Sequence, residues 1–453
     1  MRGKFIQKKA QWYWYCGQNG AKMGVSEAPW GFLVFAHKHD IPCGQKIKNK
    51  KQKGEINVKR LISILLALLM VAVMLPVMAM AAEPTEVATQ EALKDAVANS
   101  GNIKLTTDIV LTETLTINTG VTIVLDLAGN KISAAMNKPH MISSAGNLTI
   151  IDSVGTGSIA KEGNSSDFGY VLENHGTMVL NGIKVTSASS KSSAIENGWY
   201  TAADNTTGAT CEMTITNSDI SQANGSGGLY TIKNDDYGVM VINGGNFTNS
   251  TAGAGTVLNW NDLTIKDGNF TGVAAVRTLK EGELGYEKGN TLINGGTFNG
   301  KIDTLPKYSD VQIGVMGGTF NTDVTAYAGD TLVVENNGTY HVGDAAQNAV
   351  QNATSGTFTV KKAENGTSLT VKPGVTVENG MNDGKVTVNG NEVKPGATYT
   401  VPGTPIIIYN PTVDTPKAND QKNPSTGAND LVGVAAAMAV VSLLGAAAVI
   451  RKK

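Results

Sequence analysis

The stretch VINGGNF, residues 241–247, returns three times further along the chain with modest changes. The copies read TIKDGNF at 264–270, LINGGTF at 292–298 and GVMGGTF at 314–320. Their closing phenylalanines follow one another at spacings of 23, 28 and 22 residues: Phe247, Phe270, Phe298 and Phe320. Looser copies precede them, VLNGIKV at 179–185 and TITNSDI at 214–220. A fixed period of roughly 20–30 residues predicts one structural unit per copy, stacked on its neighbours.

The copies share one internal order: an apolar residue, a variable residue, a turn with glycine, a polar residue and a large apolar residue. No helical periodicity fits inside it, and alternating residues indicate short strands. We therefore expect each unit to be one coil of about three strands, with equivalent strands stacked in parallel and the four phenylalanines in one internal line. Glycine at the turn would supply left-handed backbone conformations. Asn181, Asn243 and Asn294 tolerate the same conformation and could hydrogen-bond from coil to coil.

A short helix precedes the first coils. It is predicted over residues 90–99, with Thr89 as its N-cap, Gly101 after its end, and one apolar face. Short alternating strands follow it, at 103–105, 109–111, 115–117 and 121–127. Such a helix would shield the open end of a stack of coils.

These residues resemble the right-handed parallel β-helix proteins of the pectate-lyase-like superfamily. The resemblance spans about residues 89–322 and is one of pattern, without a diagnostic motif. It implies an all-β fold, a right-handed parallel β-helix solenoid over residues 82–322 with an N-terminal capping helix. A β-sandwich array and a β-propeller are the alternatives, although a propeller requires about 40–45 residues per blade.

The period breaks after residue 322. Residues 323–401 predict a small β-rich C-terminal module, with a polar, alanine-rich segment at 344–353. Asn365-Gly366 and Asn389-Gly390 are typical of β-hairpin turns. Residues 402–422 contain four prolines and predict an extended spacer.

The C-terminus has three parts in fixed order: the motif Asn423, Pro424, Ser425, Thr426, Gly427; an apolar run over 431–450; and Arg451-Lys452-Lys453. The run is long enough for a transmembrane helix, and the basic end would stay in the cytoplasm. Residues 423–453 resemble the cell-wall sorting signal of Gram-positive surface proteins, usually LPxTG, with Asn423 in place of Leu. The resemblance implies cleavage after Thr426 by a sortase and transfer of Thr426 to peptidoglycan. A plain membrane tail anchor is the alternative.

The N-terminal region indicates export. Residues 58–81 contain Lys59-Arg60, an apolar stretch and the small residues Ala79 and Ala81, which together predict a signal peptide cleaved after Ala81. Lys53-Gly54-Glu55 can be encoded by a ribosome-binding sequence, and Val58 by an alternative start codon. We interpret residues 1–57 as a mis-annotated leader; a long signal peptide is the alternative.

The charge and the cysteine content limit which partners and which disulfides can be expected. Residues 82–427 hold 21 of the 37 Lys and Arg and 34 of the 38 Asp and Glu, so their net charge is near −13. This acidity argues against nucleic acid as a partner. Cys211 is the single cysteine there, so no intrachain disulfide is expected; its place in an alternating strand predicts a packed side chain.

The sequence offers little that indicates catalysis. Asp235-Asp236 is the best acidic pair, and a solvated turn is the simpler expectation for it. His175 is the best histidine, and Arg277 is the single arginine of residues 82–427. His140, His175 and His341 have no metal-ligand spacing. Asp235, Asp236, Asp262 and Asp267 form the one set that could meet across coils. We predict no catalytic residues, no metal site and no cofactor, with Ca²⁺ the one ion considered.

The aromatic residues Trp199, Tyr200, Tyr230, Tyr237 and Trp260 could stack on sugars if they pointed outward in a row, but packing is the simpler expectation. The leading hypothesis is therefore a non-catalytic, extracellular, wall-anchored adhesin or glycan-binding surface protein. Its partners would be sortase, peptidoglycan and a glycan or host surface ligand, and it would occupy the membrane before sorting. The alternatives are a lyase or hydrolase acting on uronate-rich glycans and a passive stalk or coat element.

We expect Thr426→Ala to move the protein from the cell-wall fraction to the membrane fraction, because the bond that sortase cleaves follows Thr426. Fractionation of the producing cells with immunoblotting measures this, and Thr412→Ala in the spacer serves as the control. Covalent linkage to peptidoglycan that persists in Thr426→Ala would show that the motif is not a sorting signal.

Overall fold

The computed structural model describes residues 13–17, 20–24 and 83–403, apart from 135–139, 163–168, 201–203, 224–228, 281–288 and 306–310. The predicted signal cleavage site at Ala79 and Ala81, the sorting motif 423–427 and the apolar run 431–450 lie outside these residues. Within the described part, no helix is both long and apolar enough to cross a membrane. In the N-terminal region, β1 (Tyr13–Gly17) pairs antiparallel with β2 (Gly20–Gly24).

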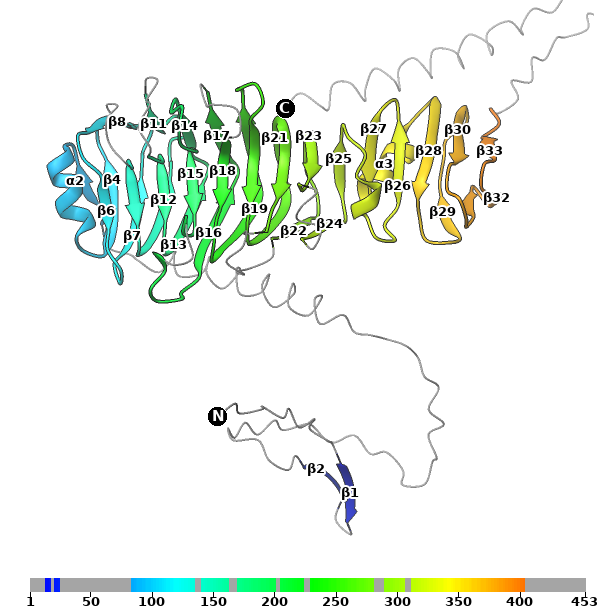
Figure 1. Cartoon of the computed structure of the whole chain (residues 1–453), viewed down its shortest axis with the longest axis horizontal. Helices are drawn as coiled ribbons and strands as arrows, with labels where there is room; N and C mark the ends of the chain where they lie inside the picture. The colour runs from blue at the N-terminus through cyan, green and yellow to red at the C-terminus, as the bar shows by residue number, and fades with distance from the viewer. Residues whose placement is uncertain are drawn as a thin grey trace, which may run out of the picture. The chain divides into compact units, whose positions relative to one another are not determined.

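The main body is a β-solenoid of about seven turns with a right-handed-like course, consistent with the predicted parallel β-helix (Figure 1). Three stacks of parallel strands form its faces. The first sheet contains β3 (Thr85–Val87), β4 (Gly101–Leu105), β7 (Thr122–Asp126), β10 (Asn147–Ile151), β13 (Thr177–Asn181), β16 (Cys211–Thr216), the starts of β19 (Gly238–Asn249) and β21 (Asp262–Thr278), β22 (Asn290–Ile293) and β24 (Gln312–Val315).

The other two faces repeat this arrangement. The second sheet contains β5 (Ile109–Leu111), β8 (Lys131–Ala134), β11 (Ser158–Lys161), β14 (Lys184–Ser187), β17 (Ser218–Gln222), the later parts of β19 and β21, β23 (Thr297–Asp303) and β25 (Gly318–Phe320). The third sheet contains β6 (Leu115–Ile117), β9 (Ile142–Ser144), β12 (Leu172–Asn174), β15 (Ile195–Asn197), β18 (Tyr230–Asn234), β20 (Gly255–Asn259) and the ends of β21 and β23. Each residue thus lies beside its equivalent in the next coil.

The repeat phenylalanines form a continuous column inside the solenoid. Phe247, Phe270, Phe298 and Phe320 are at most 1% exposed, and successive ring centroids lie 4.7, 4.8 and 4.7 Å apart with nearly parallel planes. The second glycine of each turn explains why the motif is so regular. Gly245 and Gly268 have φ of +123° and +129°, and a Cβ on Gly245 would lie 2.1 Å from the carbonyl oxygen of Ser218. Only glycine therefore fits this stacked turn.

Asparagines do hydrogen-bond from coil to coil, but not the three asparagines that the sequence predicted. Asn181, Asn243 and Asn294 do not have positive φ, and Asn243 Nδ2 donates to Thr216 Oγ1 at 3.2 Å rather than to another asparagine. A buried ladder occurs instead at the end of the third sheet. It runs Asn174 Nδ2 to Asn197 Oδ1 (2.7 Å), Asn197 Nδ2 to Asn234 Oδ1 (2.7 Å) and Asn234 Nδ2 to Asn259 Oδ1 (2.8 Å). These amides satisfy one another where the chain turns inside the core.

The predicted capping helix is confirmed as α2 (Gln90–Val97), which lies at one end of the stack of coils (Figure 1). Thr89 Oγ1 accepts a hydrogen bond from the Ala92 N–H at 3.1 Å, as an N-cap does. Leu93 and Val97 are buried in the same apolar core as the strands. The helix therefore covers apolar side chains that the first coil would otherwise expose.

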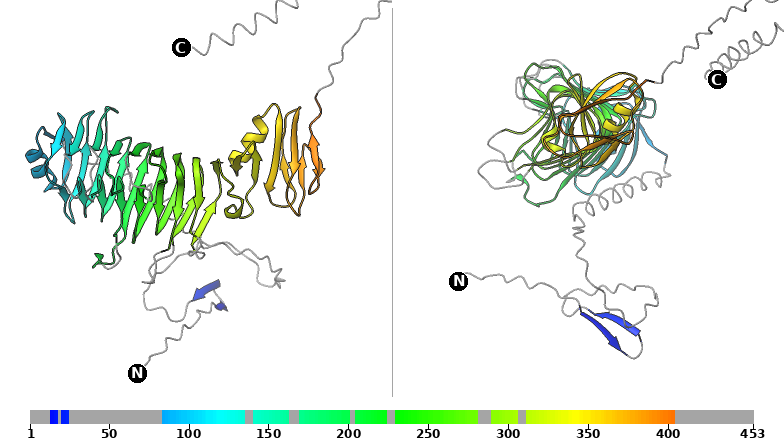
Figure 2. Two further views of the ribbon diagram at one scale, coloured as in Figure 1. Left: turned by 45° about the horizontal axis from the view of Figure 1, so that its top comes forward. Right: turned by 90° about the vertical axis from the view of Figure 1, so that its right-hand side faces the viewer.

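A module with its own apolar core follows the last coils, visible in yellow and orange in Figures 1 and 2. After the 3₁₀ turn Thr325–Tyr327, it contains β26 (Val333–Asn336), β27 (Thr339–Val342), α3 (Asp344–Asn352), β28 (Gly356–Lys362), β29 (Thr367–Leu369), β30 (Val375–Asn379), β31 (Val386–Val388), β32 (Asn391–Val393) and β33 (Thr398–Thr400). Here β27 pairs antiparallel with β25, so the parallel pattern ends at Phe320. The alanine-rich segment is helical because Ala346 and Val350 face the core.

One of the two predicted hairpins forms. Asn389 and Gly390, with φ of +48° and +84°, join the antiparallel strands β31 and β32. The hairpin at Asn365-Gly366 was wrong: β28 pairs in parallel with β30, and β29 pairs in parallel with β31. Asn365 Oδ1 instead accepts a hydrogen bond from the Lys385 N–H at 3.0 Å. The module thus contains a short second solenoid, in which an Asn-Gly pair turns the chain from one sheet to the next.

We expect Phe270→Ala to lower the free energy of unfolding by about 3–5 kcal/mol, because it removes a ring packed between two others and leaves a cavity. Urea-induced unfolding of the purified protein measures this. Thr271→Ala is the matched control, since Thr271 is the next residue of β21 and is exposed; it should change stability by less than about 0.5 kcal/mol. Equal effects of the two substitutions would contradict the column's role.

Candidate functional site

A row of polar side chains lies on the outer surface of the third sheet. Ser143, Glu173, Glu196 and Lys233 occupy equivalent positions of β9, β12, β15 and β18, each beside the next in the parallel register. Their neighbours along each strand point into the core, so these four point outward. Glu173 is nevertheless 9% exposed and Glu196 2% exposed. Two buried glutamates on adjacent strands need specific compensation.

Glu173 is held by three side chains. Ser143 Oγ donates to its Oε2 at 2.6 Å, while His140 Nε2 and His175 Nε2 lie 3.4 and 3.9 Å from its Oε1. The Tyr170 N–H donates to His140 Nδ1 at 3.4 Å, so the proton of neutral His140 is on Nε2, directed at Glu173. Burial lowers the pKa of both His140 and His175, which favours neutral rings.

Glu196 is the most perturbed carboxyl group of this row. Burial, together with a hydrogen bond to Asp235, raises the pKa of Glu196 to about 9. Lys233 Nζ lies 3.6 Å from Glu196 Oε1 but forms its short ion pair with Asp235. Burial lowers the pKa of Lys233, yet the carboxylates of Asp235 and Glu196 raise it overall. Lys233 is therefore a fixed cation and is poorly suited to accept a proton.

Aromatic rings surround this group. The His175 ring stacks on Trp199 with centroids 3.8 Å apart and planes 5° apart. Lys233 Nζ lies 4.9 Å from the ring centre of Tyr200 and 5.9 Å from that of Tyr170. Tyr200 is 73% exposed and is the outermost of these residues. The rings hold the imidazole of His175 in one orientation.

The structure brings together some of the residues singled out from the sequence. His175, His140 and Asp235 meet here, beside Lys233, which the sequence analysis did not single out. Asp235 and Asp236 lie in the turn between β18 and β19, as predicted, but both are 4% exposed, so this turn is buried rather than solvated. Asp262 and Asp267 are exposed and lie elsewhere on β21. Arg277 binds Asp303 through two hydrogen bonds of 2.7 and 2.8 Å. Cys211 is buried, as expected.

The aromatic residues do not form an outward row. Tyr230 is 6% exposed and packs with Leu258, while Trp260 packs against the same small cluster. Tyr237 lies in a turn with φ of +61°. Trp199 and Tyr200 are thus the two that adjoin the polar group, and the packing expectation holds for Tyr230 and Trp260.

Sequence reasoning missed Glu173 and Glu196, although a signal was present. The triplets Leu-Glu-Asn at 172–174, Ile-Glu-Asn at 195–197 and Ile-Lys-Asn at 232–234 repeat one pattern. In the structure their first residues face the core, their second residues form the polar row, and their asparagines form the ladder. Aligning the third strand of each coil would have found both glutamates.

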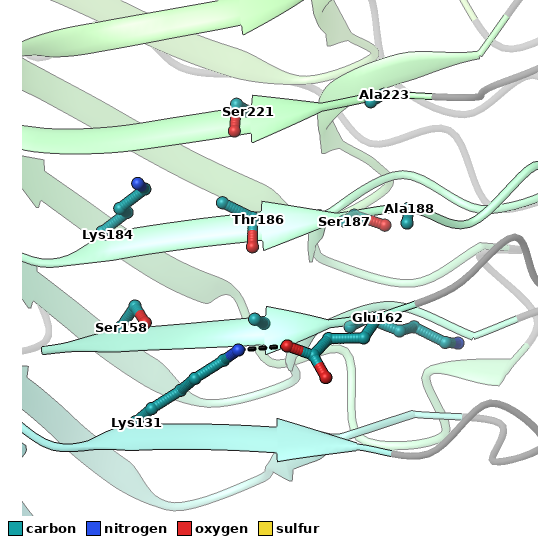
Figure 3. Close-up of a pocket in the computed structure, with 11 residues that line it drawn as sticks. Lys131, Ser158, Glu162, Lys184, Thr186, Ser187, Ala188, Ser221 and Ala223 are labelled. Carbon is teal, nitrogen blue, oxygen red and sulfur yellow. Dashed lines mark hydrogen bonds and ion pairs between the residues drawn. The ribbon is translucent and has the colours of Figure 1, made fainter.

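A second feature is a groove on the outer surface of the second sheet (Figure 3). Its volume is about 550 Å³, and it crosses β8, β11, β14 and β17. Small side chains form its floor, including Ala160, Thr186 and Ser221, and lysines stand along it. Lys131 forms an ion pair with Glu162. The buried Lys161 Nζ donates to the Gly169 carbonyl oxygen at 2.7 Å and fixes the corner toward the third sheet.

Comparisons with protein-family models, with curated proteins and with solved structures gave no match to this chain. The similarity to pectate-lyase-like proteins therefore rests on the coil pattern. It concerns the fold type and carries no catalytic residue over to this chain.

The arrangement of the polar row does not suit the cleavage of glycans. A sugar oxygen must contact a catalytic acid, and Glu196 is 2% exposed. Elimination from a uronate needs a base near neutral pKa, and Lys233 is held protonated by Asp235 and Glu196. The carboxylates of Glu173 and Glu196 and the imidazole of His175 are groups of the kind that can hold a metal ion.

We expect no cleavage of polygalacturonate at pH 7–8, with or without added Ca²⁺. Absorbance of unsaturated products and a reducing-sugar assay measure the two cleavage routes. Activity that is present in the purified protein and lost in Glu173→Gln or Asp235→Asn would establish an enzyme and remove the non-catalytic interpretation.

Proposed function

We propose that this chain is an exported, cell-wall-anchored surface protein whose solenoid binds glycan chains in the groove of the second sheet without cleaving them. Two features of the sequence support display at the surface: the signal peptide at 58–81 and the ordered C-terminal signal at 423–453. The groove supports the binding function. It is the observation on which the proposal depends, because a rigid concave surface with polar lining fits an extended polymer.

The lining of the groove suits sugars in size and chemistry. Ser158, Thr186 and Ser221 present hydroxyl groups that can both donate and accept hydrogen bonds. Ala160 keeps the floor low between them. The backbone below is fixed on both sides by parallel pairing, so little conformational entropy is lost when a chain binds.

Charge favours glycans that carry anionic groups. Lys184 is exposed at the groove and forms no ion pair with any other described residue, whereas Lys131 is paired with Glu162. A local positive charge on an otherwise acidic body attracts carboxylate or sulfate groups over a distance of about 10 Å at 0.1 M salt. Binding should therefore weaken as ionic strength rises.

Polar side chains of the following coils, distinct from the polar row of the third sheet, extend the groove along the second sheet. Asn246 Nδ2 donates to Asp219 Oδ1 at 2.7 Å, and Asn269 Nδ2 donates to Asn246 Oδ1 at 2.9 Å. Asp219 lies beside Lys184 in the register, so these amides continue the line of the groove. A long glycan could contact several coils at once, and such weak contacts add through effective concentration.

We expect Thr186→Trp to reduce binding of polygalacturonate and hyaluronate by about tenfold or more, because the indole fills the groove. Lys184→Ala should reduce binding of these acidic chains but not of xylan. Affinity electrophoresis of the secreted protein measures all three glycans.

The matched control is Thr122→Trp. Thr122 is exposed on β7 of the first sheet, away from the second sheet, and does not line the groove. Equal loss of binding in both tryptophan variants would contradict the groove as the site. Absence of binding to all the glycans would favour the passive stalk.

A further inference from the structure

We propose that Glu173, His175 and Glu196 bind a divalent transition-metal ion on the third sheet, separate from the glycan groove. One ligand atom from each residue, two carboxylate oxygens and the His175 imidazole nitrogen, lies within 4.8 Å of the others. A single ion can contact all three after small side-chain adjustments, because metal–ligand distances of about 2.0–2.2 Å bring such atoms closer together. The three residues come from two adjacent coils.

Glu196 has the capacity that an ion would use. Its Oε1 atom is buried and accepts no hydrogen bond within the described part of the chain. Lys233, the neighbouring cation, forms its short contact with Asp235 and stays 3.6 Å away. A buried carboxylate oxygen without a donor is costly, and a cation removes that cost.

The other two ligands are held in place before any ion binds. Ser143 Oγ fixes one oxygen of Glu173 at 2.6 Å, and His140 directs its Nε2–H at the other from 3.4 Å. This His140 tautomer makes it a positioning residue for Glu173, since its Nε2 carries a proton. The stack on Trp199 fixes the His175 ring. Such outer contacts orient ligands and raise metal affinity.

The donor set identifies the class of ion. Two carboxylates and one imidazole suit Zn²⁺ or Mn²⁺, whereas Ca²⁺ and Mg²⁺ prefer oxygen ligands alone. Three protein ligands also leave coordination positions for water or another small oxygen ligand. We therefore expect one ion per chain, with Zn²⁺ and Mn²⁺ bound more tightly than Ca²⁺ or Mg²⁺.

Isothermal titration of the EDTA-treated secreted protein at pH 8 with Zn²⁺, Mn²⁺ and Ca²⁺ tests this proposal. Glu173→Gln, His175→Gln and Glu196→Gln should each weaken Zn²⁺ and Mn²⁺ binding by at least about tenfold, and Ser143→Ala should weaken it by about tenfold through the outer contact. Glu212→Gln is the control, because Glu212 is exposed on the first sheet.

Circular dichroism and urea unfolding confirm that each variant is folded. If Glu173→Gln fails to fold, Glu173→Asp replaces it, because this substitution keeps the charge but shortens the side chain. Stoichiometry near one, lost with any of the three ligands and kept in Glu212→Gln, supports the site. Zn²⁺ and Mn²⁺ dissociation constants above about 1 mM, or tight binding unchanged in all three variants, would overturn it. Glycan binding by Thr186→Trp is measured independently, so failure of one proposal does not imply failure of the other.

Discussion

Backbone hydrogen bonds between parallel strands hold every residue about 4.8 Å from its equivalent in the next coil, and all other features follow from this spacing. An amino acid that suits one coil must suit its neighbours, because like side chains come into contact. Rings satisfy this condition by stacking, as Phe247, Phe270, Phe298 and Phe320 do. Amides satisfy it by donating to one another, as Asn174, Asn197 and Asn234 do.

Two carboxylates do not make a favourable contact with each other in successive coils by themselves. Glu173 and Glu196 are adjacent in the register, and like charges placed side by side in a sheet are destabilising. The solenoid tolerates the pair because Ser143 donates a hydrogen bond to Glu173 and Lys233 lies 3.6 Å from Glu196. Burial and the hydrogen bond to Asp235 also raise the pKa of Glu196, which favours its neutral form. An arrangement that costs stability at one place in an otherwise regular stack is a reason to assign it a function.

The sequence was sufficient for the fold because the repeat carries its geometry in each copy. Gly245 and Phe247 specify a turn and an inward ring, and later copies confirm both. The N-terminal helix was predictable from Thr89 and the apolar face that includes Leu93. The Asn365-Gly366 turn was misread because a local turn signal does not say whether the following strand pairs with the preceding one or with a later coil.

The polar row was harder to predict because its members are 23 and 37 residues apart. Glu196 follows Glu173 by 23 positions, Lys233 follows Glu196 by 37, and the coils between them differ in loop length. Spacing therefore cannot pair them. Their equivalence shows only when the repeated triplets at 172–174, 195–197 and 232–234 are aligned, as the register of the third sheet aligns them. Asp235 does lie in a turn, but its burial could not be predicted because it depends on the contact with Lys233 from the same corner of the coil.

The two ends of the solenoid have a consequence for the behaviour of many copies at once. A stack of coils is open to unlimited elongation, since the last strand of one molecule could pair with the first strand of another. Here α2 covers one end, and the reversed direction of β27 replaces the parallel pairing that a further coil would need at the other. Both ends of the stack thus work against end-to-end strand pairing, the route by which solenoids elongate into fibrils.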